Sequence, residues 1–302
     1  MAQLILVSLF PLIALIMMGF FLKRCAFVED GFWRSVEKIN YYILFPVMLF
    51  MALASAKIEL STVGQLMQAI ILVLIVACIV LYAIRKIYQT KSARFGVYMQ
   101  SNVRFNTYIG LALVATLLAL PGMAIFAMML AFCIPLVNIL SILAMTEPEK
   151  MNMMGILSSL AKNPLILGCI VGAGFNASGL MLWDGLEDFL NQLARCSLPL
   201  GLLTVGAALK LNGFKTDLLP LLLNTFSRLL LMPLLAFAVC SLLHLPLLQT
   251  QVLVLFFALP TASASYILTK VLGGDSEMMA NIISLQTICA LFTLPMMIYL
   301  VM

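Results

Sequence analysis

The chain has 302 residues, of which 64% are hydrophobic and only 10% are charged. Soluble domains carry charge on about a quarter of their residues, so the composition excludes a soluble globular protein and indicates a membrane domain throughout. The net charge is +5 and the chain contains one histidine. Zinc motifs such as His-Glu-x-x-His need two histidines, and no pair of carboxylates lies deep in an apolar segment. We therefore expect neither an enzyme nor a bound cofactor.

Apolar segments follow one another along the chain with short polar connections between them. A window of about 19 residues predicts ten membrane spans, at 4–22, 37–56, 63–84, 96–120, 123–145, 155–174, 186–209, 217–243, 248–270 and 279–301. Each is long enough to cross about 30 Å of hydrocarbon as a helix. A lipid-exposed segment must satisfy its own backbone groups, so we predict an all-α membrane protein with ten transmembrane helices.

Lysine and arginine are distributed unevenly between the connections. Those after the odd-numbered spans contain Lys23, Arg24, Arg34, Lys38, Arg85, Lys86, Lys91, Arg94, Lys150, Lys210, Lys215 and Lys270. The other side has only Lys57. The positive-inside rule then predicts that the odd-numbered connections are cytoplasmic and that both termini lie outside. This bias accounts for the net charge, and we expect no binding of nucleic acid.

The ten spans are predicted to form one five-span unit written twice, over residues 1–150 and 151–302. A shift of 153 positions places Pro11 on Pro164, Gly19 on Gly172, Pro46 on Pro199 and Lys57 on Lys210. Because each unit has an odd number of spans, the second must enter the bilayer from the opposite side. The alternative is duplication of a generic membrane fold. An inverted repeat is typical of secondary transporters, which bind substrate near the midplane where the halves meet.

Three arginines, Arg104, Arg195 and Arg228, fall deep within the predicted spans. Each costs about 2.5–3.5 kcal/mol at the bilayer centre on insertion scales, which suggests a use. A guanidinium fits a carboxylate, so an anion site is one interpretation. In the other, Arg195 and Arg228 donate to carbonyls freed by broken helices or reach toward an interface. Without a deep acidic residue, coupling to sodium or protons must use carbonyls, hydroxyls, amides or the substrate's own proton.

Two spans are predicted to be broken. Span 4 contains a polar run over 100–108, and span 9 contains Pro260 followed by hydroxyl residues. The repeat offset places Thr107 on Pro260, and paired interruptions of this kind point to a transporter site. Alternatively, the hydroxyls bond back within their own helices. We predict a substrate site formed by Asn102, Arg104, Asn106, Thr107, Tyr108, Pro260, Thr261, Ser263 and Ser265, with Arg195 and Arg228 as further candidates.

Short motifs in spans 4, 9 and 10 resemble those of the auxin efflux carrier family. They are Asn106-Thr107-Tyr108 with Gly110, Ala258-Leu259-Pro260 through Gly273-Gly274-Asp275, and Thr293-Leu294-Pro295. Plant members carry Asn-Pro-Asn-Thr-Tyr in span 4, where this chain has Arg104 and Phe105 in place of the first two residues. The short connection between spans 5 and 6 is similar to that of bacterial members, which are described as permeases for small carboxylates such as malate or malonate.

The resemblance implies a fold like that of bile acid–sodium symporters. Spans 1, 2, 6 and 7 would form a scaffold that dimerises, and spans 3–5 and 8–10 would form a moving transport domain. Spans 4 and 9 would cross at the site, and an elevator-like motion would carry the substrate.

These inferences together predict a secondary transporter of a small organic anion, a carboxylate, in the inner membrane of a bacterium. Its partners would be the anion, the lipid bilayer and a second copy of the chain. One alternative is a sodium-coupled symporter of a larger amphipathic acid such as a bile acid. The other is a membrane sensor that uses the same fold without transport.

Overall fold

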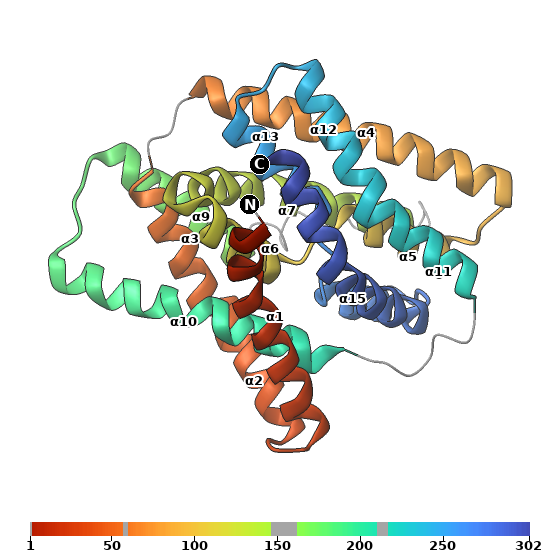
Figure 1. The fold of residues 1–302 in the computed structure, drawn as a ribbon, viewed down its shortest axis with the longest axis horizontal. Coiled ribbons are helices and arrows are strands. Elements are labelled where there is room, and N and C mark those ends of the chain that lie inside the picture. The colour runs from red at the N-terminus through yellow and green to blue at the C-terminus, as the bar shows by residue number, and fades with distance from the viewer. Residues whose placement is uncertain (1, 57–59, 146–161, 210–216) are drawn as a thin grey trace.

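The computed structural model describes residues 2–56, 60–145, 162–209 and 217–302, and within these ranges the chain is helical and contains no strand (Figure 1). The helices are α1 (Ala2–Arg24), α2 (Asp30–Ile39), η1 (Asn40–Leu44), α3 (Phe45–Ala54), α4 (Leu60–Tyr88), α5 (Ser92–Val103), α6 (Thr107–Leu117), α7 (Ala119–Met145), α9 (Pro164–Ser178), α10 (Asp184–Ala208), α11 (Leu218–Phe226), η3 (Ser227–Leu231), α12 (Met232–Leu242), α13 (Leu247–Ala258), α14 (Ala264–Val271) and α15 (Ser276–Val301). The two η elements are π-helical turns that continue directly into the next α-helix. The expectation of an all-α protein is confirmed.

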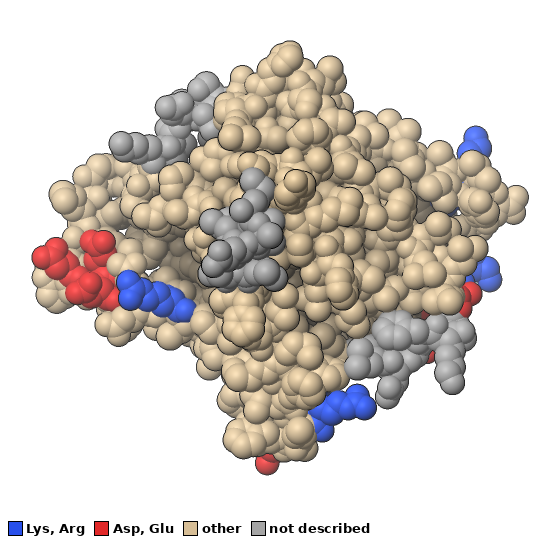
Figure 2. Space-filling model, viewed as in Figure 1, with Lys and Arg blue, Asp and Glu red and all other residues tan. Residues whose placement is uncertain are grey.

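Several helices have the length and composition needed to cross a bilayer. Within the described ranges there are 5 such stretches, at Asp30–Ala54, Gly64–Tyr88, Ala119–Met145, Leu218–Leu242 and Ser276–Val301. Figure 2 shows a broad face on which charged side chains lie only near the edges. Large apolar side chains such as Phe10, Ile79 and Trp183 are exposed. Such surfaces are stable against hydrocarbon but not against water, as expected of an integral membrane protein.

The five stretches correspond to the predicted spans 2, 3, 5, 8 and 10. The predicted spans 4 and 9 are each divided. Span 4 becomes α5 and α6, and span 9 becomes α13 and α14. Both predicted interruptions are therefore present. Residues 155–161 of span 6 lie outside the described ranges, as do Lys57, Lys150, Lys210 and Lys215, so one of the four repeat matches has no structural counterpart here.

Close helix packing depends on glycines in two helix pairs, α1 with α10 and α3 with α9, which have the most extensive contacts between helices (Figure 1). A Cβ on Gly19 of α1 would lie 2.0 Å from the carbonyl oxygen of Leu203 in α10, and one on Gly172 of α9 would lie 2.8 Å from that of Phe50 in α3. The offset of 153 places Gly19 on Gly172 and Phe50 on Leu203. The two contacts are thus equivalent under the shift found in the sequence.

This packing gives a test of stability at Gly206, where an added Cβ would lie 1.8 Å from the carbonyl oxygen of Ile16. We expect Gly206→Ala to lower the free energy of unfolding by about 1–3 kcal/mol, because the backbones of α10 and α1 must move apart to make room for the added Cβ. Thermal unfolding of purified protein in detergent measures the loss. The matched control is Gly64→Ala in α4, where nothing lies within 4 Å of the added Cβ and helix propensity rises. Equal melting temperatures for the two variants would contradict the packing argument.

Connections after spans 3, 5, 7 and 9 meet on one side of the molecule. Arg94, at the start of α5, forms an ion pair with Asp217, which precedes α11. The backbone N–H of Asp275, before α15, donates to the carbonyl oxygen of Ala93 (3.5 Å). The side chain of Met145, at the end of α7, fills the space beside Gly274. The connections predicted to share one side of the bilayer are therefore neighbours in space.

Candidate functional site

The two broken helices meet at their breaks. Between α5 and α6 the chain is extended at Arg104 and Asn106, and α13 gives way to an extended Leu259 before Pro260. Proline disfavours helical backbone at the residue before it and has no N–H to donate, which explains the second break. The N–H of Asn106 donates to the carbonyl oxygen of Pro260 (2.8 Å). We call the place where the two breaks meet the crossing. It brings together the C-terminal ends of α5 and α13 and the start of α6.

Asn106 explains why the chain restarts as a helix after the first break. Its Oδ1 accepts from the N–H groups of Tyr108 (3.1 Å) and Ile109 (3.2 Å), as an N-cap does. This bond fixes the amide so that the Nδ2 group points away from the cap. Asn106 is 1% exposed, and its Nδ2 has no hydrogen-bond partner among the described residues. A buried donor without a partner costs free energy, so this amide is a candidate for contact with a ligand.

Arg104, Thr107 and Tyr108 are half-buried around the same break. The Arg104 guanidinium donates one long hydrogen bond to Gln100 Oε1 (3.5 Å), and in the described part of the chain it forms no ion pair with a carboxylate. The ring of Tyr108 stacks on Phe45 of α3, with centroids 4.4 Å apart. The segment between α5 and α6 thus carries both a guanidinium without a carboxylate partner and the unpartnered Nδ2 of Asn106, two residues apart in the sequence.

On the second break, the predicted residues have different surroundings. Thr261 is fully buried; its N–H donates to Gln286 Oε1 (2.9 Å) and its hydroxyl donates to the carbonyl oxygen of Ser101 (2.7 Å). Pro260 is buried and Ser263 is half-buried. Ser265 is fully buried, and its hydroxyl has no partner within the ranges that the structure describes. Thr261 is therefore a structural link, whereas the Ser265 hydroxyl has no such role among the described residues.

Asn102 is also occupied by the protein. Its Nδ2 donates to the carbonyl oxygen of Tyr98 (2.9 Å), and its Oδ1 accepts from the hydroxyl of Ser227 (2.8 Å). The side chain is 2% exposed. Asn102 therefore holds α5 against η3, and both its amide nitrogen and its amide oxygen have a protein partner in this conformation.

The two further arginine candidates separate clearly. Arg228 in η3 is fully buried and donates to the carbonyl oxygens of Asn102 (2.6 Å), Leu259 (2.7 Å) and Phe256 (3.5 Å). Arg195 has an exposed side chain on α10. The interpretation in which a deep arginine donates to carbonyls freed by broken helices fits Arg228.

Several buried amides, among them Asn40, Asn224 and Gln286, were not predicted from charges and helix breaks. Gln286 of α15 donates to Asn224 Oδ1 of α11 (3.0 Å) as well as accepting from Thr261. Asn40 of η1 donates to the carbonyl oxygen of Ser197 in α10 (2.9 Å) and accepts from its hydroxyl (2.8 Å). The signal was an amide side chain in an otherwise apolar span, since such a group requires a partner there.

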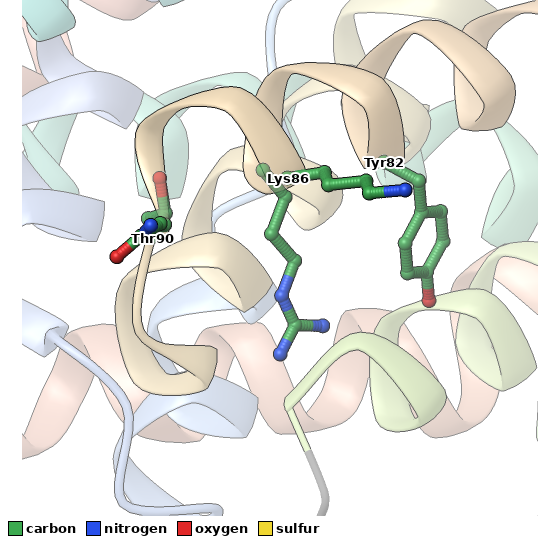
Figure 3. A pocket seen from close by; sticks show the side chains of 5 residues that line it. Tyr82, Lys86 and Thr90 are labelled. Atoms are coloured by element: carbon green, nitrogen blue, oxygen red, sulfur yellow. The ribbon is translucent and has the colours of Figure 1, made fainter.

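A cavity of about 580 Å³ lies at the C-terminal end of α4, away from this crossing in sequence (Figure 3). It is lined by Tyr82, Arg85, Lys86, Gln89 and Thr90. The Arg85 guanidinium donates to the hydroxyl of Ser92 (2.9 Å) and lies over the ring of Phe95. None of the predicted substrate residues lines it.

Comparison with known proteins bears on the second half of the chain. A family model described as membrane transport protein matches residues 124–298. The match covers most of α7 through most of α15, including Arg228 and the break at Pro260, and begins after the break at Arg104. No curated protein matches the chain.

Proposed function

Because the chain belongs to the auxin efflux carrier family of membrane transport proteins, we propose that it is a secondary carrier of a small organic anion, a carboxylate. Members of this family are transporters rather than enzymes. The substrate class is the proposal, and it rests on the chemistry of the crossing.

The observation that carries the proposal is the buried Asn106 Nδ2 without a protein partner. This donor lies at the N-terminus of α6, where the helix dipole favours negative charge. Arg104 is two residues away and has no carboxylate partner among the described residues. A donor, a helix N-terminus and a guanidinium together favour a carboxylate over a neutral or cationic ligand.

The size of the anion is inferred from the aromatic wall beside the site. An added Cβ on Gly201 of α10 would lie 2.1 Å from Cδ1 of Tyr108, so the ring is packed closely on that helix as well as on Phe45. Tyr108 therefore has little room to move aside for a bulky substrate in this conformation. This favours a small carboxylate over a bile-acid-like molecule.

The mechanism that we propose is an elevator-like motion between two groups of helices. The scaffold would contain α1, α2, η1, α3, α9 and α10, and the transport domain would contain α4–α7 and α11–α15. Close packing of α1 with α10 and of α3 with α9 supports the first group, and contacts of α12 with α4 and α13 support the second. Tyr108 would contact the scaffold from the moving side. The equivalent contacts of Gly19 and Gly172 support the inverted repeat. Dimerisation through the scaffold is part of the proposal and rests on the resemblance to the family alone.

The orientation belongs to the same proposal: a bacterial inner membrane, with both termini outside. The basic connections after odd-numbered spans would be cytoplasmic, which the meeting of Ala93, Arg94, Asp217 and Asp275 on one side supports. The membrane potential then favours export, since moving one negative charge outward down 100 mV yields about 2.3 kcal/mol. Import would need sodium, protons or an exchanged anion.

Transport current in sealed proteoliposomes tests the proposal. Malate, malonate, lactate, indole acetate and taurocholate are offered in turn, each with and without sodium and a pH gradient. We expect a saturable current for a small carboxylate, and none for taurocholate. A current for taurocholate that requires sodium would favour the symporter of amphipathic acids. Silence with folded protein across the panel would favour either a substrate class outside the panel or a non-transporting role.

A further inference from the structure

Arg228 lies where two half-helices end. Its Nε donates to the carbonyl oxygen of Leu259 at 2.7 Å, and one terminal nitrogen donates to that of Asn102 at 2.6 Å. The other terminal nitrogen reaches the carbonyl oxygen of Phe256 at 3.5 Å. Asn102 belongs to the last turn of α5, and Phe256 and Leu259 belong to the end of α13. One side chain therefore binds the C-terminal ends of both broken helices.

These carbonyls need a positive partner. A helix that stops inside the membrane leaves its last carbonyls without intrahelical donors, and its C-terminal end carries partial negative charge. Two such ends meeting in an apolar interior repel each other, and a cation between them offsets this repulsion. In transporters with discontinuous helices, inorganic cations are bound by such carbonyls.

The π-helical turn η3 places the Arg228 guanidinium against both helix ends. It spans Ser227–Leu231 and inserts an extra residue into the helix formed with α11 and α12. Such turns are rare and are frequent at functional sites. The hydroxyl of Ser227 binds Asn102 Oδ1 at 2.8 Å, so two successive residues of η3 hold the end of α5.

We propose that Arg228 is a positioning residue whose guanidinium serves as a built-in cation for the crossing, in the place where an inorganic cation would otherwise bind the carbonyl ends. It joins α5, α13 and η3 into one body. In this way it fixes the positions of the Arg104 and Asn106 side chains, which follow the end of α5. As a consequence, the crossing requires no sodium ion at these carbonyls. The consequence for transport rests on the proposed function, whereas the consequence for stability does not.

The first test measures thermal unfolding of purified protein in detergent, with 10 mM choline, sodium or guanidinium chloride at constant ionic strength. We expect equal melting temperatures for the wild type in choline and sodium. Arg228→Ala leaves two or three buried carbonyls without a donor, and we expect its melting temperature to fall by about 5–10 °C. Guanidinium should raise the melting temperature of this variant above its value in choline, because it can enter the space left by the side chain.

The matched control is Arg34→Ala, which removes an exposed arginine from α2. Its melting temperature should equal that of the wild type and should not respond to guanidinium beyond the response of the wild type. Wild-type stabilisation by sodium over choline, or an Arg228→Ala variant as stable as the wild type, would overturn the proposal. So would the absence of any specific recovery in guanidinium.

A second pair of variants covers the case in which Arg228→Ala does not fold. Arg228→Lys keeps the charge, and Arg228→Gln keeps hydrogen-bonding capacity without it. We expect the lysine variant to melt at a higher temperature than the glutamine variant and, in proteoliposomes, to retain more of the sodium-independent transport. Equal melting temperatures for the two would show that charge is not what the carbonyl ends require.

Discussion

Arg104→Ala is expected to lower the rate of anion transport at limiting substrate by about 100-fold, while the protein remains folded. The guanidinium is half-buried at the crossing and has only a 3.5 Å hydrogen bond to Gln100 within the described residues. Its removal therefore leaves no buried protein charge without a partner. A charge-assisted hydrogen bond contributes about 1.5–3 kcal/mol, and 100-fold corresponds to about 2.7 kcal/mol. Saturable current in proteoliposomes, measured over a range of carboxylate concentrations, gives the loss.

Two further variants separate charge from bulk at this position. Arg104→Lys keeps a positive charge but loses the planar fork, so we expect intermediate transport; Arg104→Gln should behave like the alanine variant. Arg34→Ala, in which an exposed arginine is removed from α2, should transport at the wild-type rate. Wild-type kinetics in Arg104→Ala, with correctly oriented protein, would remove Arg104 from the substrate site.

Asn106→Asp is expected to abolish anion transport and also to lower the melting temperature, because a carboxylate replaces a neutral amide at a buried position. The aspartate retains an oxygen that caps α6, because Asp and Asn are equally good N-caps. It replaces the unpartnered Nδ2 donor with a negative charge, either facing the substrate or pairing with Arg104. Like charges in a binding site cost several kcal/mol, which corresponds to a loss of more than about 100-fold.

Asn163→Asp provides the matched control. Asn163 caps α9 in the same way, with its Oδ1 accepting from the N–H groups of Leu165 (3.0 Å) and Ile166 (3.4 Å). It precedes Pro164 and takes no part in the crossing. The same substitution there should leave both transport and stability unchanged. Equal losses of transport in the two variants would mean that the cap, rather than the free amide, is what Asn106 contributes.

The sequence predicted the helices well because the bilayer leaves few options. A backbone in lipid must satisfy its own hydrogen bonds, so apolar length alone locates helices such as α4, α7 and α15. The breaks were also predictable, since Pro260 cannot continue a hydrogen-bonded turn and Asn106 can cap a new one. The offset of 153 residues also relates Gly19 to Gly172, and both glycines pack closely on the backbone of a neighbouring helix.

Roles within the polar set at the crossing were not predictable in the same way. The local sequence makes Asn102, Thr261 and Arg228 candidates for substrate binding. For Arg228 it also allows the alternative in which the side chain donates to carbonyls freed by broken helices. In the structure each is held by groups distant along the chain: Ser227 for Asn102, Gln286 for Thr261, and the carbonyl of Asn102, 126 residues away, for Arg228.

By itself, then, the sequence determined that this is an all-helical membrane protein with two interrupted helices, because the solvent imposes those features residue by residue. Only the tertiary structure decided which polar groups the protein uses to hold the interruptions together and which it leaves without a protein partner. The reason is physical: a buried donor or acceptor is satisfied by whichever group the fold brings within about 3 Å, and that group's position in the sequence is unconstrained. Asn106 Nδ2 remains without such a partner among the described residues, and Arg228 has three.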